Sequence, residues 1–276
     1  MNSQHPILAV IALGMGFAGM ASAAITFNNG SFDASGTTTG AFYGTSNITT
    51  GLAGWTLAGM AGSAQIDCIL PGSASGQVCN GNAPSTFDTT ATSAHPANVY
   101  YFSLYAYPGA SPNGGNYFLA DGDPNFSGAL SQTVTGLVAN HTYQVSFYQA
   151  AGEENCLADD GPPGCPPPSG HLTGQWNVTF GGTTLSSALM TTPVDTTKPS
   201  TILTGWQHQA LSFQATSTSQ VLQFLAVGTP SGAPPLVFLD GITITETPEP
   251  GALGLLGLGL LMLGVVRLRK RPRKTQ

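Results

Sequence analysis

Residues 142–147 read Thr-Tyr-Gln-Val-Ser-Phe, and residues 175–180 read Gln-Trp-Asn-Val-Thr-Phe. In both stretches every second residue is apolar or aromatic, and the residues between them are polar. A strand points successive side chains to opposite faces, so a period of two predicts half-buried β-strands. The two stretches therefore favour a fold made of sheets that each turn one face toward a core.

Further strands are expected along residues 24–246, separated by clusters of Gly, Pro, Asn and Asp and without helical periodicity. They are Ile25–Phe27, Gly54–Leu57, Ala64–Ile69, Val99–Tyr105, Tyr117–Ala120, Leu130–Val134, Leu211–Ala215, Val221–Val227 and Leu236–Thr245. About ten or eleven strands without intervening helices predict an all-β fold, an antiparallel jelly-roll-type β-sandwich. No internal repeat of fixed period is present, which disfavours a propeller or a solenoid.

The composition of this region is poor in charged residues, and those present are almost all acidic. Charged residues make up 7% of the 276-residue chain, against about 25% in ordinary globular proteins. Lys198 is the one Lys or Arg before residue 267, whereas all thirteen acids lie between Asp33 and Glu249. Nucleic-acid binding depends on Lys and Arg that neutralise phosphates, so the composition argues against a nucleic-acid partner.

The C-terminal region has three parts in a fixed order. Pro248-Glu249-Pro250 is followed by an apolar run over residues 251–266 and by a basic tail over residues 267–274 that holds six cations. As a helix the run would reach roughly 24 Å, a little under the ~30 Å of bilayer hydrocarbon, so we expect a short transmembrane helix. Because the cations do not cross the bilayer cheaply, the C-terminus is expected in the cytoplasm and the preceding chain outside.

This arrangement over residues 247–276 resembles the PEP-CTERM sorting signal of Gram-negative bacteria, whose motif maps onto Pro248, Glu249 and Pro250. The resemblance implies an exosortase as processing partner, a precursor anchored in the inner membrane, removal of the tail, and delivery to the cell surface or the extracellular matrix. It implies nothing about the activity of the preceding domain.

The N-terminus is consistent with the same route. An apolar stretch over residues 7–20 leads to the small residues Ala21 and Ala23, which predicts a signal peptide over residues 1–23, cut by signal peptidase before Ala24. Residues 1–6 contain no Lys or Arg, which departs from the usual charged start. The expected organisation is a signal peptide, an extracellular sandwich over residues 24–246, and the sorting signal.

Four cysteines lie in two local pairs, Cys68 with Cys79 and Cys156 with Cys165. In an exported chain the simplest prediction is that each pair forms a disulfide, although the two other connectivities stay open. A zinc site is the alternative, but neither pair has the usual ligand spacing and no His lies nearby in sequence.

Several short motifs resemble the galactose-binding-like jelly rolls found in carbohydrate-binding modules. They are Asn29–Asp33, Gly54–Thr56, Leu130–Thr133 and Phe238–Ile242. In such modules a structural calcium often ties the first strand region to the last, and this carries over here to Asp33 and Asp240. The resemblance also implies a polysaccharide ligand.

Asp240 stands out on physical grounds as well. If residues 236–244 form one regular strand, Asp240 shares a face with Leu236, Phe238, Ile242 and Ile244. A carboxylate buried there would need protonation, hydrogen bonds or a metal, and Ca²⁺ prefers oxygen ligands. The alternative is a bulge at Gly241 that shifts the register and turns Asp240 to solvent.

Two other acidic stretches contain residues suited to calcium binding or to catalysis. Asp121 and Asp123 begin a D-x-D-x-N pattern, but Gln132 stands where a calcium-binding EF-hand loop needs Glu, so a turn is the preferred interpretation. Glu153 and Glu154 could act as a carboxylate pair on a glycoside, although acids on a Pro-rich loop are usually solvated.

Aromatic side chains are the remaining candidates for ligand binding. Tyr101 and Tyr107 lie in an aromatic stretch, and an exposed ring suits the apolar side of a sugar. No motif of a Ser hydrolase, zinc protease or phosphate-binding loop occurs, so no catalytic residue is assigned. We therefore expect a non-catalytic surface or matrix protein that binds polysaccharide, with an anchored glycan hydrolase as the alternative.

Overall fold

The computed structural model describes residues 24–33, 41–43, 53–58, 66–71, 79–80, 101–102, 104, 106–125, 127–153, 171–193, 202–231, 235–248, 259 and 261–262. Strands dominate this part of the chain. They are β1 (Ala41–Tyr43), β2 (Thr56–Ala58), β3 (Ile66–Pro71), β4 (Cys79–Asn80), β5 (Tyr101–Phe102), β6 (Asn116–Asp121), β7 (Ala129–Thr135), β8 (Thr142–Glu153), β9 (Thr173–Phe180), β10 (Thr183–Ser186), β11 (Met190–Thr191), β12 (Gln207–Gln214), β13 (Ser219–Thr229) and β14 (Pro235–Glu246).

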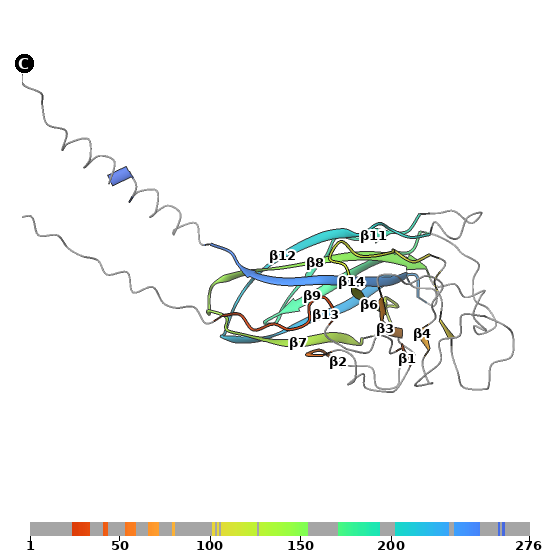
Figure 1. Cartoon of the computed structure of the whole chain (residues 1–276), viewed down its shortest axis with the longest axis horizontal. Coiled ribbons are helices and arrows are strands. Elements are labelled where there is room, and N and C mark those ends of the chain that lie inside the picture. The colour runs from red at the N-terminus through yellow and green to blue at the C-terminus, as the bar shows by residue number, and fades with distance from the viewer. Residues whose placement is uncertain are drawn as a thin grey trace, which may run out of the picture.

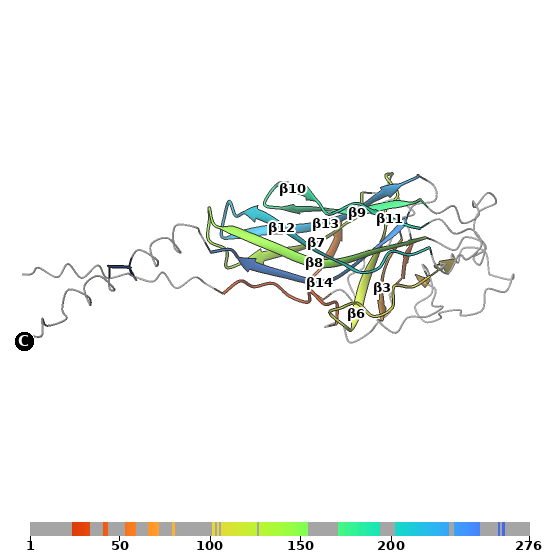
Figure 2. The same ribbon diagram turned by 90° about the horizontal axis from the view of Figure 1, so that it is seen from above.

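Two antiparallel sheets build the sandwich (Figures 1 and 2). Sheet A has the order β10-β9-β13-β7-β2, with β11 also paired to β9, and sheet B has the order β1-β3-β6-β14-β8-β12. Strands distant in sequence are neighbours in both sheets, as in the β3-β6-β14 pairings of sheet B. The predicted all-β, antiparallel jelly-roll-type sandwich is confirmed.

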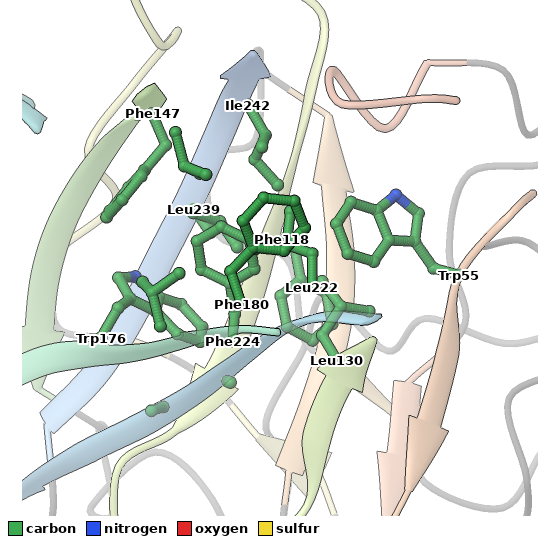
Figure 3. Close-up of a cluster of buried hydrophobic side chains, with 14 of the residues drawn as sticks. Trp55, Phe118, Leu130, Phe147, Trp176, Phe180, Leu222, Phe224, Leu239 and Ile242 are labelled. Carbon is green, nitrogen blue, oxygen red and sulfur yellow. The ribbon is translucent and has the colours of Figure 1, made fainter. Parts of the chain in front are cut away.

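The main core lies between the sheets and is rich in aromatic rings (Figure 3). Trp176 and Phe224 of sheet A meet at a ring-centroid distance of 6.1 Å, and Trp176 approaches Phe118 of sheet B at 6.3 Å. The Trp176 indole N–H donates to the carbonyl of Phe238 at 3.1 Å, so a hydrogen bond also joins the two sheets. The alternation seen in residues 142–147 and 175–180 places Tyr143, Val145 and Phe147, and Trp176, Val178 and Phe180, in this core.

A second apolar cluster covers part of the outer face of sheet B. Leu119, Leu236 and Phe238 of the sheet pack with Leu104, and Trp206 lies against the same cluster. The rings of Tyr117, Trp206 and Phe238 lie within 5.5 to 6.3 Å of one another. This cluster explains why residues of β3 and β6 are buried on both faces of the sheet. Alternation in the sequence alone would predict one buried face and one solvent-exposed face.

Ten of the eleven expected strands correspond to strands of the structure, whereas residues 25–27 form only one isolated bridge, between Thr26 and Thr135. No helix within the described residues is long and apolar enough to cross a membrane. Of the expected membrane segment, residues 259, 261 and 262 are described, and the rest lies outside the described part, as do the signal peptide before Ala24 and the basic tail.

Candidate functional site

Asp240 is fully buried on β14, against a loop formed by residues 106–115. The Ser111 hydroxyl donates a hydrogen bond to Asp240 Oδ2, and the Asn113 backbone N–H donates to Ser111 Oγ at 3.0 Å. Asp240 Oδ1 is buried without a hydrogen-bond partner in the described part of the chain. An unpaired carboxylate oxygen is costly in an apolar interior, so this position calls for a proton or a cation.

The expectation that β14 is one regular strand is wrong beyond Asp240. The register with β8 shifts between Asp240 and Thr243, and Gly241 has a positive φ of 61°. Leu236 and Phe238 belong to the second cluster, whereas Ile242 packs in the main core. A bulge therefore exists at Gly241, as the alternative proposed, but Asp240 stays buried because the loop with Ser111 covers it.

Asp33 lies next to this loop and ties the N-terminal segment to sheet B. Its Oδ1 accepts a hydrogen bond from the Asn116 backbone N–H at 2.8 Å, and the Asn116 amide donates to the Phe32 carbonyl at 3.2 Å. The carboxylate packs so closely on Gly115 that a Cβ at position 115 would lie 2.1 Å from Oδ1. The Ile242 N–H also donates to the Gly30 carbonyl at 2.9 Å, so β14 contacts the N-terminal segment just after the bulge.

The pKa of Asp240 depends on its burial and on its neighbours. Burial raises the pKa of Asp240 to about 7 and Asp33 adds to the rise, while hydrogen bonding from Ser111, from the Gly241 backbone and from Asn113 lowers it. The described part of the chain contains no Lys or Arg. No described cation therefore offsets the two acids when both are ionised.

These residues fit a calcium ion better than a transition metal. Carboxylate oxygens of Asp33 and Asp240, with the Ser111 hydroxyl oxygen nearby, are the hard donors that Ca²⁺ prefers. The described residues contain no group of three His, Cys, Asp or Glu side chains arranged for a metal. A calcium ion here would depend on neutral oxygens in addition to the two carboxylates.

Sheet A differs from sheet B in a way that the sequence analysis did not identify. Its strands read TLA, ALSQTVT, TGQWNVTF, TTLS, MT and SQVLQFLAVGT, and none carries an ionisable side chain. Sheet B carries Asp67, Asp121, Asp240, Glu153 and Glu246 within its strands. The outer face of sheet A is thus an uncharged surface about five strands wide.

One row of polar side chains runs from edge to edge of this sheet, and all of its members except the buried Ser131 are exposed at least in part. Cross-strand pairing aligns Thr56 of β2, Ser131 of β7, Gln223 of β13, Thr179 of β9 and Thr184 of β10. At strand spacings of about 4.8 Å the row is roughly 19 Å long. The hydroxyls of Thr56 and Ser131 lie 2.9 Å apart and those of Thr179 and Thr184 2.7 Å apart, with Gln223 between the two pairs.

A second row lies beside the first, with Leu225 aligned to Asn177 and Ser186. The Ser186 hydroxyl donates to Asn177 Oδ1 at 2.8 Å, which fixes the orientation of that amide. The alternation in residues 175–180 already indicated the polar side of β9, but the rows need the strand register, which local sequence does not contain.

The tyrosines proposed for glycan stacking lie elsewhere. Tyr107 is half-buried and packs against the second cluster on sheet B, so only part of its ring is accessible. Tyr101 belongs to β5, which pairs with β4 in a separate two-stranded sheet, and its side chain lies outside the described residues. Both residues stay predictions as ligand contacts.

The cysteines are described in part. Cys68 is buried on β3 and disulfide-bonded, and Cys79 begins β4. Cys156 and Cys165 lie outside the described residues. The connectivity stays a prediction.

Glu153, which was weighed for catalysis, and Asp121, which was weighed for a calcium loop, lie at the same end of the sandwich. Glu153 is buried at the end of β8, Asp121 is buried at the end of β6, and Asp123 is buried two residues further on. Asp121 Oδ1 accepts the Asp123 N–H at 2.8 Å, and Asp123 Oδ1 accepts the Asn125 N–H at 2.8 Å, which is the turn that the sequence predicted. Glu154 lies outside the described residues.

Comparison with known proteins finds no matching family and no matching curated protein. Among solved structures, the chain is similar to the Stig cyclase Fisc from Fischerella sp. TAU, at 14% identity and a TM-score of 0.42, covering 82% of this chain and 98% of that one.

Carbohydrate-binding modules are also among the similar structures. TmCBM61 in complex with β-1,4-galactotriose has 17% identity and a TM-score of 0.30 over 50% of this chain and 74% of that one. The CBM22-1 xylan-binding domain of Paenibacillus barcinonensis Xyn10C has 11% identity and a TM-score of 0.28 over 54% and 81%. With TM-scores this low, these similarities carry no argument about what the present chain binds.

Proposed function

We propose that this chain is an exported, non-catalytic protein of the cell surface or extracellular matrix that binds a neutral polysaccharide through the outer face of sheet A. The observation that carries the proposal is a six-strand sheet without one ionisable side chain, crossed by a row of hydroxyl and amide groups. Hydroxyls and amides both donate and accept, which matches the hydroxyls of a sugar chain. An uncharged face avoids the cost of desolvating charges when such a ligand docks.

The binding is expected to be weak for a single site. The aromatic side chains of sheet A, including Trp176, Phe180 and Phe224, are buried in the core, so no ring of this sheet stacks on a sugar. Each neutral hydrogen bond contributes only about 0.5–1.5 kcal/mol, so a few of them give a dissociation constant on the order of 1 mM. Retention of the protein on a polysaccharide then depends on a long polymer or on several copies of the protein that bind it together.

Delivery by the PEP-CTERM route, with signal peptidase and exosortase as processing partners, belongs to the same proposal. The Thr247 N–H and hydroxyl both hydrogen-bond to the Thr142 carbonyl, at 2.9 and 3.0 Å, so the sandwich is still anchored one residue before Pro248. Cleavage near Pro248-Glu249-Pro250 would leave every described strand in the released part.

Calcium has a structural role in this proposal. Bound between Asp33 and Asp240, it would connect the N-terminal segment, the 106–115 loop and the β14 bulge. The ion supplies positive charge beside two acids, and Ser111 and Asn113 hold Asp240 in place for it.

An anchored glycan hydrolase is the second candidate, and the raised pKa of Asp240 favours it, because a carboxyl group with a raised pKa is typical of the general acid of a glycosidase. Against it, Asp240 is fully buried beneath Ser111, out of reach of a glycosidic oxygen. Glu153 is also buried.

The test uses residues 24–248, which contain all members of both apolar clusters and so form one folding unit. This segment is incubated with insoluble neutral polysaccharides, and both bound protein and released sugar are measured. Retention without sugar release supports the proposal. Sugar release that Asp240→Asn or Glu154→Gln abolishes would establish the hydrolase, and failure of every neutral polysaccharide to retain the protein would contradict binding.

A further inference from the structure

The four outer edges of the two sheets differ sharply in length. β1 and β2 have three residues each and β10 has four, whereas β12, at the end of sheet B, has eight. Short edge strands offer few open backbone groups to a foreign strand. In the part of the chain that the structure describes, β12 is the one edge among these four with a long ladder.

Between Gln207 and Gln214, β12 also lacks the other features that protect edge strands. Its sequence, QHQALSFQ, contains no Lys, no Pro and no acid, and it pairs with β8 from Gln207 to Gln214 without a register shift. Before β12 the pairing with β8 continues at the Leu203–Gly152 bridge and at the Thr204 N–H bond to the Ala151 carbonyl, but with a shift of one residue, so a bulge at residues 205–206 ends the regular edge at Gln207. Monomeric proteins normally interrupt such an edge with charge, Pro or a bulge.

The backbone groups of β12 alternate between β8 and the open edge. The Ala215 N–H donates to the His141 carbonyl at 2.8 Å, which marks the odd-numbered residues as those that bond to β8. The N–H and C=O groups of His208, Ala210, Ser212 and Gln214 therefore point to the open edge. The side chains of these four residues are exposed on the outer face of sheet B.

We propose that β12 pairs antiparallel with β12 of a second copy of this chain, which joins two sheets B into one continuous sheet. Pairing about Ala210 places His208 opposite Ser212 of the second copy, and pairing about Leu211 places Ala210 opposite Ser212. Both registers keep the exposed side chains on one face, as a packed sheet requires. Neither register places like charges opposite each other. This matters because residues 24–250 contain one Lys and thirteen acids, so other surfaces of two copies would repel each other.

The dimer is independent of the ligand, since β12 belongs to sheet B. It would, however, present two outer faces of sheet A to one polymer, and linked weak sites bind more tightly than single ones.

The first test introduces Ala210→Cys and Ser212→Cys separately into the full chain in its membrane, because Cα atoms of paired strands lie at disulfide distance. After mild oxidation, non-reducing electrophoresis should show a band of twice the chain mass for Ala210→Cys alone, or for the two variants mixed. Thr184→Cys, at the exposed edge strand β10, is the matched control and should stay at the level of the parent chain.

The second test uses Ala210→Lys, which sets two cations against each other across the expected axis. Sedimentation of the detergent-solubilised full chain should give a dimer mass for the parent and a single-chain mass for the variant, with unfolding temperatures within about 2 °C for a surface substitution. A parent that sediments as one chain would overturn the proposal. So would a cross-linked product containing a different polypeptide.

Discussion

At the scale of single residues, Asp240 links the sequence pattern to the physics of the site. A carboxyl group in an otherwise apolar alternation was identifiable from sequence because burying a lone charge is costly. The partners of Asp240 could not be identified from the sequence, because Ser111 lies 129 positions earlier in a loop without regular structure. The sequence also left open whether Asp240 is buried, and the covering loop decides this.

The raised pKa of Asp240 predicts how stability depends on pH. Between the usual pKa near 3.8 and the folded value of about 7, the folded state holds the proton more tightly than the unfolded state. Stability without calcium should therefore fall as pH rises through this window and should level off above it. Thermal unfolding of residues 24–248 in chelator, from pH 4 to pH 8, measures the slope.

Calcium should reverse this trend, because the ion binds the ionised carboxylate and stabilises only the folded state. In excess calcium the unfolding temperature at pH 8 should rise by several degrees, and Asp240→Asn should remove both the calcium effect and the pH slope. Identical melting curves for parent and Asp240→Asn with and without calcium would show that neither a proton nor a metal at Asp240 matters.

At the scale of elements, the bulge in β14 divides one strand between two cores. Before Gly241 the even-numbered side chains Leu236 and Phe238 face the second cluster, and after it Ile242 faces the main core. Period-two reasoning predicted that this strand exists. It could not locate the change of face, because Gly241 permits a bulge without requiring one.

Substitution of Gly241 by Ala should destabilise the fold. The residue has a φ of 61°, and a Cβ would lie 3.0 Å from both Asn113 Cβ and Tyr148 Cδ2. We expect Gly241→Ala to reduce the free energy of unfolding by about 1–3 kcal/mol in chemical denaturation.

Gly182 provides the matched control, since its φ is 86° and nothing lies within 4 Å of a Cβ there. Gly182→Ala introduces backbone strain but no close contact. It should therefore lower the free energy of unfolding by less than Gly241→Ala does. Equal losses would mean that contacts with Asn113 and Tyr148 do not constrain the bulge.

Long strands were predicted well and short ones poorly. β8, β9 and β13 each contain enough alternating residues to show a period of two, whereas β1, β4, β10 and β11 have two to four residues and no readable pattern. The polar rows of sheet A were missed for a related reason. Thr56, Ser131 and Gln223 become neighbours only through pairing of strands that are far apart in the sequence.

At the scale of the whole molecule, charge is segregated between the two sheets. All acids and His208 within the paired strands of the sandwich belong to sheet B, and sheet A is neutral. The composition could not predict this division, because it gives only the total number of charged residues. It places Asp240, whose pKa is raised, in sheet B and leaves sheet A without an ionisable side chain.

Binding through sheet A should therefore be insensitive to salt. Interactions between charges are screened at high ionic strength, whereas hydrogen bonds between neutral groups are not. Retention of residues 24–248 on a neutral polysaccharide should change less than about twofold between 0.05 and 0.5 M salt at constant pH. A steep loss of retention with salt would place the contact on the acidic surface instead.

Both ends of the sandwich region lie at the turn between β7 and β8 (Figure 1). Thr26 bridges to Thr135 at the end of β7, and Thr247 bonds to Thr142 at the start of β8. If residues 251–266 sit in a membrane, this turn faces the bilayer and the end with Asp121 and Glu153 faces away. Sheet A then stands beside the tether, open to a polymer at the cell surface.

The most direct measurement compares two double variants of residues 24–248 for retention on the neutral polysaccharide that binds the parent best. Asn177→Ala with Gln223→Ala removes both amides from the rows on sheet A, and Gln144→Ala with Ser212→Ala removes an amide and a hydroxyl from a cross-strand pair on sheet B. We expect retention to fall about tenfold or more in the sheet A variant, equivalent to roughly 1.4 kcal/mol of binding free energy, and to stay unchanged in the sheet B variant. Unchanged retention of the sheet A variant, or loss only in the sheet B variant, would contradict it.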